Sequence, residues 1–147
     1  MKVERDIEIA ASPEDVYEVI MDPRRLKDWV TIHRRLKEAP EGALREGSEL
    51  RQTMKVAGQG FEVRWKVVEA TRPSHVVWEG DGPMGTSAKV VYDLEPAGEG
   101  THFSYLNEYE LPGGALGSLA GRAVAGMAGR ESEASLEKLK ALLERSS

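Results

Sequence analysis

The stretch "IAASPEDVYEVIMDPRRLKDW", residues 9–29, joins the end of a strand to two short helices. Ser12 belongs to the residue types that cap helix N-termini well, and Pro13 is favoured at the first helical position. The apolar residues that follow recur at helical spacing until Pro23, which predicts a helix that stops there. The next segment, "RRLKDW", is interpreted as a second short helix that closes on Trp29.

Extended segments lie on both sides of this helical pair. Upstream, Val3, Ile7 and Ile9 alternate with acidic residues, which is the period-two pattern of a half-buried strand. Downstream, a series of segments with strand patterns is separated by turns rich in Gly and Pro, at spacings typical of hairpins. These segments are residues 31–38, 48–56, 61–70, 74–80, 88–96 and 101–111.

The chain closes with a long amphipathic helix, in which leucines between residues 136 and 143 lie opposite Glu and Lys. Before them, small residues recur every four positions and leave one helical face almost without side chains. They are Gly117, Gly121, Ala125 and Gly129. Because strands joined by short turns pair antiparallel, and an apolar sheet face must be covered, we expect an α+β fold. The prediction is one domain over residues 1–147, with a seven-stranded antiparallel sheet covered by the C-terminal helix.

Composition limits the classes of function. The net charge of -5 is spread over segments of mixed sign, so we expect no nucleic-acid partner. No apolar run reaches the roughly 20 residues of a membrane span, and the first ten residues do not form the apolar region of an export signal. The absence of Cys removes disulfides and thiolate metal sites. We therefore expect a cytoplasmic protein, either a monomer or a homodimer.

The short motifs are weak. "GDGPMG", residues 80–85, matches a nucleotide-binding glycine pattern as a string, but it precedes a strand and contains Pro83, so it is interpreted as a turn. His33, His75 and His102 fall in different strands and lack the spacing of metal ligands. They are interpreted as surface or edge residues, with His33 and His102 on the polar-facing parity. Without Cys or a G-x-S-x-G motif the chain offers no obvious nucleophile, and we expect neither a metal nor a cofactor.

Polar residues interrupt the apolar parity of several strands. Asn107 lies in the middle of "FSYLNEYEL", residues 103–111, although a buried amide without partners costs about 1–3 kcal/mol. Gln52 has the same position in its strand. Arg5 and Arg34 share this parity near strand ends, where arginines reach solvent, and Glu79 is a further candidate.

Two interpretations of Gln52 and Asn107 stay open. They line a small-molecule site, or they are core amides that bond to backbone or buried water. The candidate ligand-binding residues are Gln52, Met54, Trp65, Trp78, Tyr92, Tyr105, Asn107 and Tyr109.

The order of elements resembles the helix-grip fold of the START-like, or SRPBCC, superfamily, and most closely its polyketide cyclase/dehydrase-like proteins. The matching stretches span the chain: the one quoted at the start, then "EGSEL", "VVEATRPSHVVWEG", "YDLEPAGEGTHFSY" and "LPGGALGSL". The resemblance implies a curved sheet wrapped around the long helix. It also implies a cavity between them for a hydrophobic or aromatic small molecule.

Three functions stay open. The first is binding of such a molecule, for example a lipid, a polyketide or an isoprenoid-like compound. The second is a cyclase/aromatase-like enzyme, with Tyr105 or Tyr109 as proton donor and with Asn107 and Gln52 positioning a carbonyl. The third is a protein-interaction module with a filled interior. The small-residue helix face and the loop "LPGGALG", residues 111–117, as a flexible access loop, would fit the first function.

Overall fold

The computed structural model describes residues 2–56, 59–110 and 119–145, without the side chains of residues 56, 59, 84 and 119–125. The strands are β1 (Lys2–Ile9), β2 (His33–Glu38), β3 (Glu49–Val56), β4 (Gln59–Thr71), β5 (His75–Asp81), β6 (Ser87–Ala97) and β7 (Gly100–Glu110). The α-helices are α1 (Pro13–Ile20), α2 (Leu26–Trp29) and α3 (Leu119–Arg145), and the 3-10 turns are η1 (Pro23–Arg25) and η2 (Pro83–Gly85).

The helical pair forms for the reasons that the sequence indicates. The Ser12 hydroxyl accepts a hydrogen bond from the Asp15 backbone N–H at 3.2 Å, and this caps α1. The Asp22 carboxylate accepts one from the Arg24 backbone N–H at 3.0 Å and begins η1, which continues into α2. The prediction of two short helices between the first two strands is confirmed.

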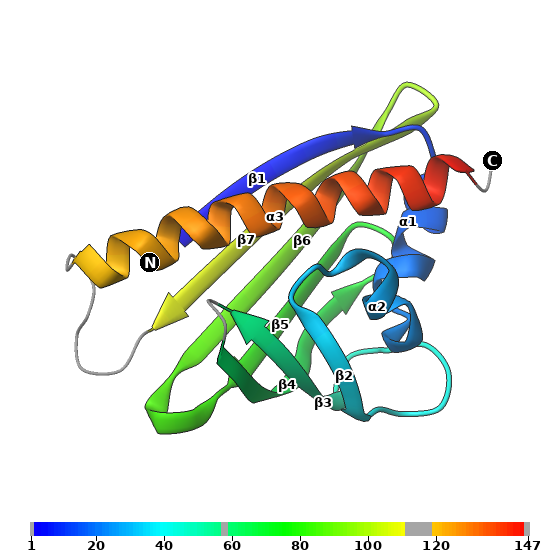
Figure 1. Ribbon diagram of the computed structural model, residues 1–147. Coiled ribbons are helices and arrows are strands. Elements are labelled where there is room, and N and C mark those ends of the chain that lie inside the picture. The colour runs from blue at the N-terminus through cyan, green and yellow to red at the C-terminus, as the bar shows by residue number, and fades with distance from the viewer. Residues whose placement is uncertain (1, 57–58, 111–118, 146–147) are drawn as a thin grey trace.

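The strands form one antiparallel sheet in the order β1-β7-β6-β5-β4-β3-β2. Figure 1 shows α3 lying across one face of this curved sheet, with α1 and α2 at the end where α3 stops. We call the face toward α3 the inner face. The predicted helix-grip architecture, with its seven-stranded antiparallel sheet, is confirmed.

Polar contacts hold α3 along β1. The Arg5 guanidinium pairs with the Glu133 carboxylate at 2.9 Å, and Lys140 donates to the Glu8 carbonyl at 2.8 Å. A Cβ atom at Gly129 would lie only 2.6 Å from Arg5 Nη2. The small residue at position 129 therefore makes room for an arginine that reaches the surface. Of the other small residues of this face, Gly117 lies outside the described residues, and 121 and 125 lie in the part of α3 described by its backbone alone.

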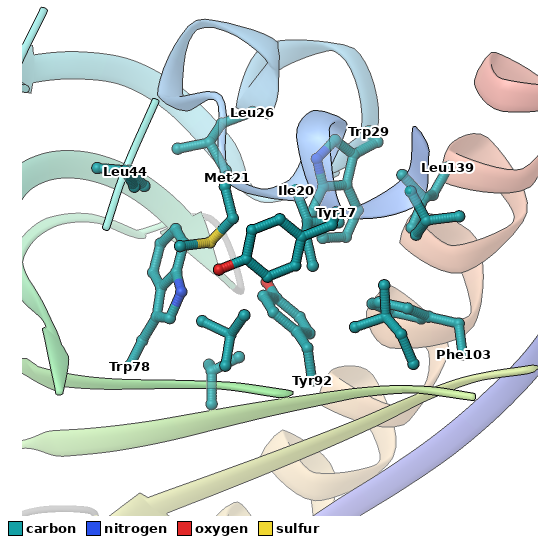
Figure 2. Packing of buried hydrophobic residues seen from close by; sticks show 14 of the residues in the cluster. Tyr17, Ile20, Met21, Leu26, Trp29, Leu44, Trp78, Tyr92, Phe103 and Leu139 are labelled. Carbon is teal, nitrogen blue, oxygen red and sulfur yellow. The ribbon is translucent and has the colours of Figure 1, made fainter. Parts of the chain in front are cut away.

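The core lies between the inner face and the helices. Trp29 of α2, Ile20 of α1, Phe103 of β7 and Leu139 of α3 are each at most 1% exposed, and Figure 2 shows them packed around Tyr92 of β6. Within the described ranges, no helix combines the length and the apolar character needed to cross a membrane. The predicted turn at "GDGPMG" is confirmed, because η2 connects β5 to β6 there.

Candidate functional site

All eight predicted ligand-binding residues lie on the inner face. Strand register aligns them in rows: Tyr105 lies opposite Tyr92, and Asn107 lies opposite Val90, which pairs in turn with Trp78. Gln52, Met54, Trp65, Trp78, Tyr92 and Asn107 are buried, and Tyr105 and Tyr109 are partly buried. The loop predicted to give access, residues 111–117, lies outside the described residues.

Aromatic side chains form a continuous series across the centre of the sheet. The rings of Trp65 and Trp78 meet edge to face at 6.0 Å, and Trp78 meets Tyr92 in the same way at 6.1 Å. Tyr92 stacks on Tyr105 at 5.5 Å and also contacts Trp29 of α2 at 6.0 Å. Such rings provide a wall that is apolar in its body and polar at its N–H and O–H groups.

Gln52 is held at the β4 end of this series. Its Oε1 accepts a hydrogen bond from Trp65 Nε1 at 2.9 Å, and its Nε2 lies 2.8 Å from His33 Nδ1. An indole N–H only donates, so Gln52 Oε1 must face Trp65 and the amide nitrogen must face the imidazole. His33 Nδ1 is then the acceptor, and the proton of the neutral ring lies on Nε2.

His33 corrects the predicted orientation of β2. The sequence placed it on the polar face and Arg34 on the inner face, but pairing shifts by one residue between His33 and Arg35. A β-bulge reverses which parity points inward, and nothing in the strand pattern marks it. His33 therefore pairs with the buried Met54, while Arg34 is exposed and donates to the carbonyl of Thr31.

Burial, reinforced by the nearby Arg34 charge, lowers the pKa of His33 below 6.5, which favours the neutral ring. Glu79, the other inward candidate, is exposed, because β5 turns Trp78 and Gly80 inward and Glu79 outward.

Asn107 forms the second polar group of the inner face. Its Nδ2 donates to the hydroxyls of both neighbouring tyrosines, at 2.8 Å for Tyr105 and 2.6 Å for Tyr109. The hydroxyl of Ser132 on α3 also hydrogen-bonds Tyr105. Burial raises the pKa of Tyr105 to about 12, and burial likewise raises the pKa of Tyr109. Both phenols therefore stay protonated at neutral pH.

Three buried polar atoms of this region have no hydrogen-bond partner among the described residues: Asn107 Oδ1, Trp78 Nε1 and Trp29 Nε1. Asn107 is 5% exposed, Trp78 3% and Trp29 1%. Buried polar groups are nearly always paired, so each orphan needs an explanation. The two unsatisfied donors belong to indoles that contact the Tyr92 ring, and the unsatisfied acceptor belongs to Asn107, which bonds to the tyrosine stacked on that ring.

The structure adds a carboxylate that the sequence did not single out. Glu131 of α3 accepts a hydrogen bond from the Thr31 hydroxyl, and its charge contributes to the raised pKa of Tyr109. Ser135, one helical turn further on, accepts from the Thr31 backbone N–H at 3.1 Å. In the sequence, positions 131 and 135 are related only by their helical spacing. That spacing does not identify Thr31 as the residue that both side chains contact.

The other two histidines lie on the outer face of the sheet. His75 Nδ1 is 2.6 Å from the Asp93 carboxylate, and His102 Nδ1 is 2.5 Å from that of Glu8. In each case the hydrogen bond to the carboxylate is the main cause of a raised pKa. In the ranges that the structure covers, no group of His, Asp and Glu side chains is arranged to hold a metal ion.

Comparison with known proteins agrees with this architecture. The chain is 29% identical over 128 residues to the uncharacterized protein Rv1546 of Mycobacterium tuberculosis, covering 84% of this chain and 88% of that protein. It is 25% identical over 115 residues to Toxin Rv0910 of the same organism, covering 78% of each. A conserved protein from Geobacillus kaustophilus has the same fold, with a TM-score of 0.80, 20% identity, and coverage of 99% of this chain and 97% of that one.

A family model decides the relationship. It matches residues 1–144 and describes the family as "Polyketide cyclase / dehydrase and lipid transport". The match runs from β1 to the end of α3, and so includes every element of the sheet and its covering helix. The chain therefore belongs to the polyketide cyclase / dehydrase and lipid transport family.

Proposed function

We propose that the protein binds a hydrophobic or aromatic small molecule between the inner face of the sheet and α3. The observation that carries the proposal is the set of orphaned polar atoms, Asn107 Oδ1 and the two indole N–H groups of Trp78 and Trp29. A small-molecule site is mostly apolar with a few polar groups that fix orientation. The aromatic series and these three atoms have that composition.

The chemistry of the orphaned atoms describes the ligand. Asn107 Oδ1 accepts, so the molecule needs a hydroxyl or N–H donor near β7. The indoles donate, so the molecule also needs an oxygen acceptor beside Trp78 or Trp29. A flat aromatic or polycyclic body with a hydroxyl and a carbonyl oxygen, as in phenolic polyketides, meets both demands. Membership of the family supports this class of ligand.

Matched probes test the role of Asn107. We expect 2-naphthol, which has a donor, to bind about fivefold more tightly than 2-methoxynaphthalene, which has none, because one hydrogen bond contributes about 1 kcal/mol. Isothermal titration calorimetry measures both affinities. In Asn107→Leu the difference should disappear, whereas Ser104→Ala, on the outer face of the same strand, should keep it. A preference that persists in Asn107→Leu would contradict the proposal.

Native mass spectrometry of protein purified from cells gives an independent test. A bound small molecule supports the proposal. Protein without a bound molecule, which also fails to bind either naphthalene probe, would favour the alternative of a filled interior and a protein-interaction role. In that case water would satisfy the orphaned atoms.

A cyclase-like enzyme is the second candidate, and Glu131 is the observation that favours it. This carboxylate adds a titratable group whose charge acts on Tyr109, one of the two tyrosines whose hydroxyls Asn107 aligns. Aldol closure of a poly-β-keto chain followed by dehydration releases one water per ring. Mass spectrometry of a synthetic poly-β-keto thioester incubated with the protein detects that loss.

For this enzyme, we expect Tyr105→Phe and Asn107→Leu to abolish turnover while circular dichroism stays unchanged. Full turnover in both variants would remove these residues from the mechanism, and no turnover by the parent protein would remove the enzymatic role.

A further inference from the structure

A pocket opens at the α1 end of the molecule. Its volume is about 660 Å³, within the range of small-molecule sites. Its walls come from α1, η1, the loop between β2 and β3, and Arg72 at the turn between β4 and β5. None of the eight inner-face residues lines it. We call it the α1 pocket.

Its floor is apolar and fixed in place. Tyr17 is 5% exposed, Met21 1% and Leu44 3%, and Figure 2 shows Met21 between Leu44 and Tyr17. The Leu44 backbone N–H donates to the Met21 carbonyl at 2.7 Å, which holds the β2–β3 loop against the end of α1. The floor is therefore formed without a ligand, and binding would cost little ordering of the chain.

Two arginines lie at its rim. The Arg72 guanidinium lies 5.3 Å from the centroid of the Tyr17 ring, and its ion pair with Glu18 is loose, at 3.5 Å between two exposed side chains. Arg24 donates to the main-chain carbonyls of residues 40 and 42, which carry no net charge. Within the described ranges no carboxylate oxygen lies within 4 Å of the Arg24 guanidinium. Two carboxylates also line the pocket: Glu18, which pairs with Arg72, and Asp22, which accepts from the Arg24 backbone N–H. The Arg24 guanidinium itself pairs with neither of them.

The Tyr17 hydroxyl adds a hydrogen-bonding group to the wall of the α1 pocket. Tyr17 is 5% exposed and lines the pocket, and among the described residues its hydroxyl makes no hydrogen bond. The hydroxyl is not one of the buried unpaired atoms, so it is open to the solvent in the pocket. Burial raises the pKa of Tyr17, so the phenol stays protonated and is able to donate. A neutral donor beside two guanidinium groups on an apolar floor suits a molecule with an anionic oxygen group and an apolar body.

We propose that the α1 pocket binds an amphipathic carboxylate. The carboxylate is held by Arg24 and Arg72 and accepts from the Tyr17 hydroxyl, while the apolar body lies on Met21 and Leu44. Because none of these residues belongs to the inner-face site, the inference is separate from the proposed function and does not depend on it.

Decanoate and 1-decanol are matched probes for this pocket. By isothermal titration calorimetry of the full chain at low salt, we expect decanoate to bind at least tenfold more tightly than 1-decanol, since charge-assisted hydrogen bonds are the stronger kind. Arg24→Gln and Arg72→Gln should each weaken decanoate binding about five- to tenfold and leave 1-decanol unchanged. Arg35→Gln, an exposed arginine on β2 outside the pocket, should bind decanoate like the parent.

Two further measurements assign the site. The methyl resonance of Met21 should shift when decanoate is added, and Asn107→Leu should leave decanoate affinity unchanged. The proposal is overturned if decanoate shows no preference over 1-decanol, or if the Arg24→Gln/Arg72→Gln double variant binds it like the parent. Loss of decanoate binding in Asn107→Leu would assign the carboxylate to the inner-face site and also overturn it.

Discussion

Replacing Gly80 by alanine tests whether the aromatic series is packed as described. Gly80 of β5 lies directly opposite Trp65 of β4, and an added Cβ would lie 2.6 Å from Trp65 Cε3 and 2.8 Å from Cζ3. Real contacts are never this short, so the indole has to move. Trp65 is 6% exposed, packs against Trp78 and bonds to Gln52, so any movement disturbs its neighbours as well.

Two effects set the size of the expected destabilisation by Gly80→Ala. Forcing a methyl group into a packed core costs about 1–3 kcal/mol. Losing the hydrogen bond from Trp65 to Gln52 costs about 1 kcal/mol more. We therefore expect Gly80→Ala to lower the free energy of unfolding by about 2–4 kcal/mol, which lowers Tm by roughly 6–12 °C in a chain of this size.

Chemical denaturation followed by tryptophan fluorescence measures this change. Gly126→Ala is the matched control, because position 126 is exposed inside α3 and a Cβ added there would lie 3.6 Å from Arg130 Nη1, an ordinary contact distance. In Gly126→Ala we expect the free energy of unfolding to rise by about 0.5–1 kcal/mol, because alanine has the higher helix propensity. Adding Trp65→Phe to Gly80→Ala should recover part of the loss, since the smaller ring leaves room. Unchanged stability of Gly80→Ala would refute the packing of Trp65 against β5.

Three further predictions concern single interactions. The hydrogen bond to Asp93 raises the pKa of His75, so His75 contributes stability that is present below pH 6.5 and lost as the pH rises through the folded pKa. Asp93→Asn should lower the pKa of His75 in an NMR titration, and an unchanged value would contradict this. Nitrogen-15 NMR at pH 7 should show His33 as the neutral Nε2–H tautomer, and Gln52→Leu should remove this preference; a doubly protonated ring in the parent would exclude the arrangement. Ser12→Ala should lower the free energy of unfolding by about 1 kcal/mol through the lost cap of α1, and equal denaturation midpoints would disprove the cap.

The fold was predictable because its signals are local and repeat along the chain. A cap and a proline mark α1 and its end, and alternation marks each strand independently of the others. One strand alone fails to settle a topology, but strands joined by short turns leave little choice except an antiparallel order. The sheet then has one large apolar face that must be covered, and the long leucine-bearing helix, α3, covers it.

The orientation of β2 was not predictable for a physical reason. Strand parity assumes unbroken pairing, and a bulge shifts pairing without leaving a mark in composition. The shift between His33 and Arg35 exchanged the roles of His33 and Arg34. Sequence reasoning therefore assigned the inward position to an arginine and missed the imidazole that bonds to Gln52.

Asn107 shows how far the site itself could be read from sequence. In a strand, residues two apart share a face, so an asparagine between Tyr105 and Tyr109 has both hydroxyls within reach. Its amide nitrogen has two hydrogens, and each finds one tyrosine, which leaves the carbonyl oxygen without a donor. Each of the two interpretations therefore describes one half of this side chain. The paired amide nitrogen is that of a satisfied core amide, and the unpaired carbonyl oxygen is that of a residue in the wall of a site. The satisfied half fixes the direction in which the other half accepts, and a ligand hydroxyl is the group we expect to meet it.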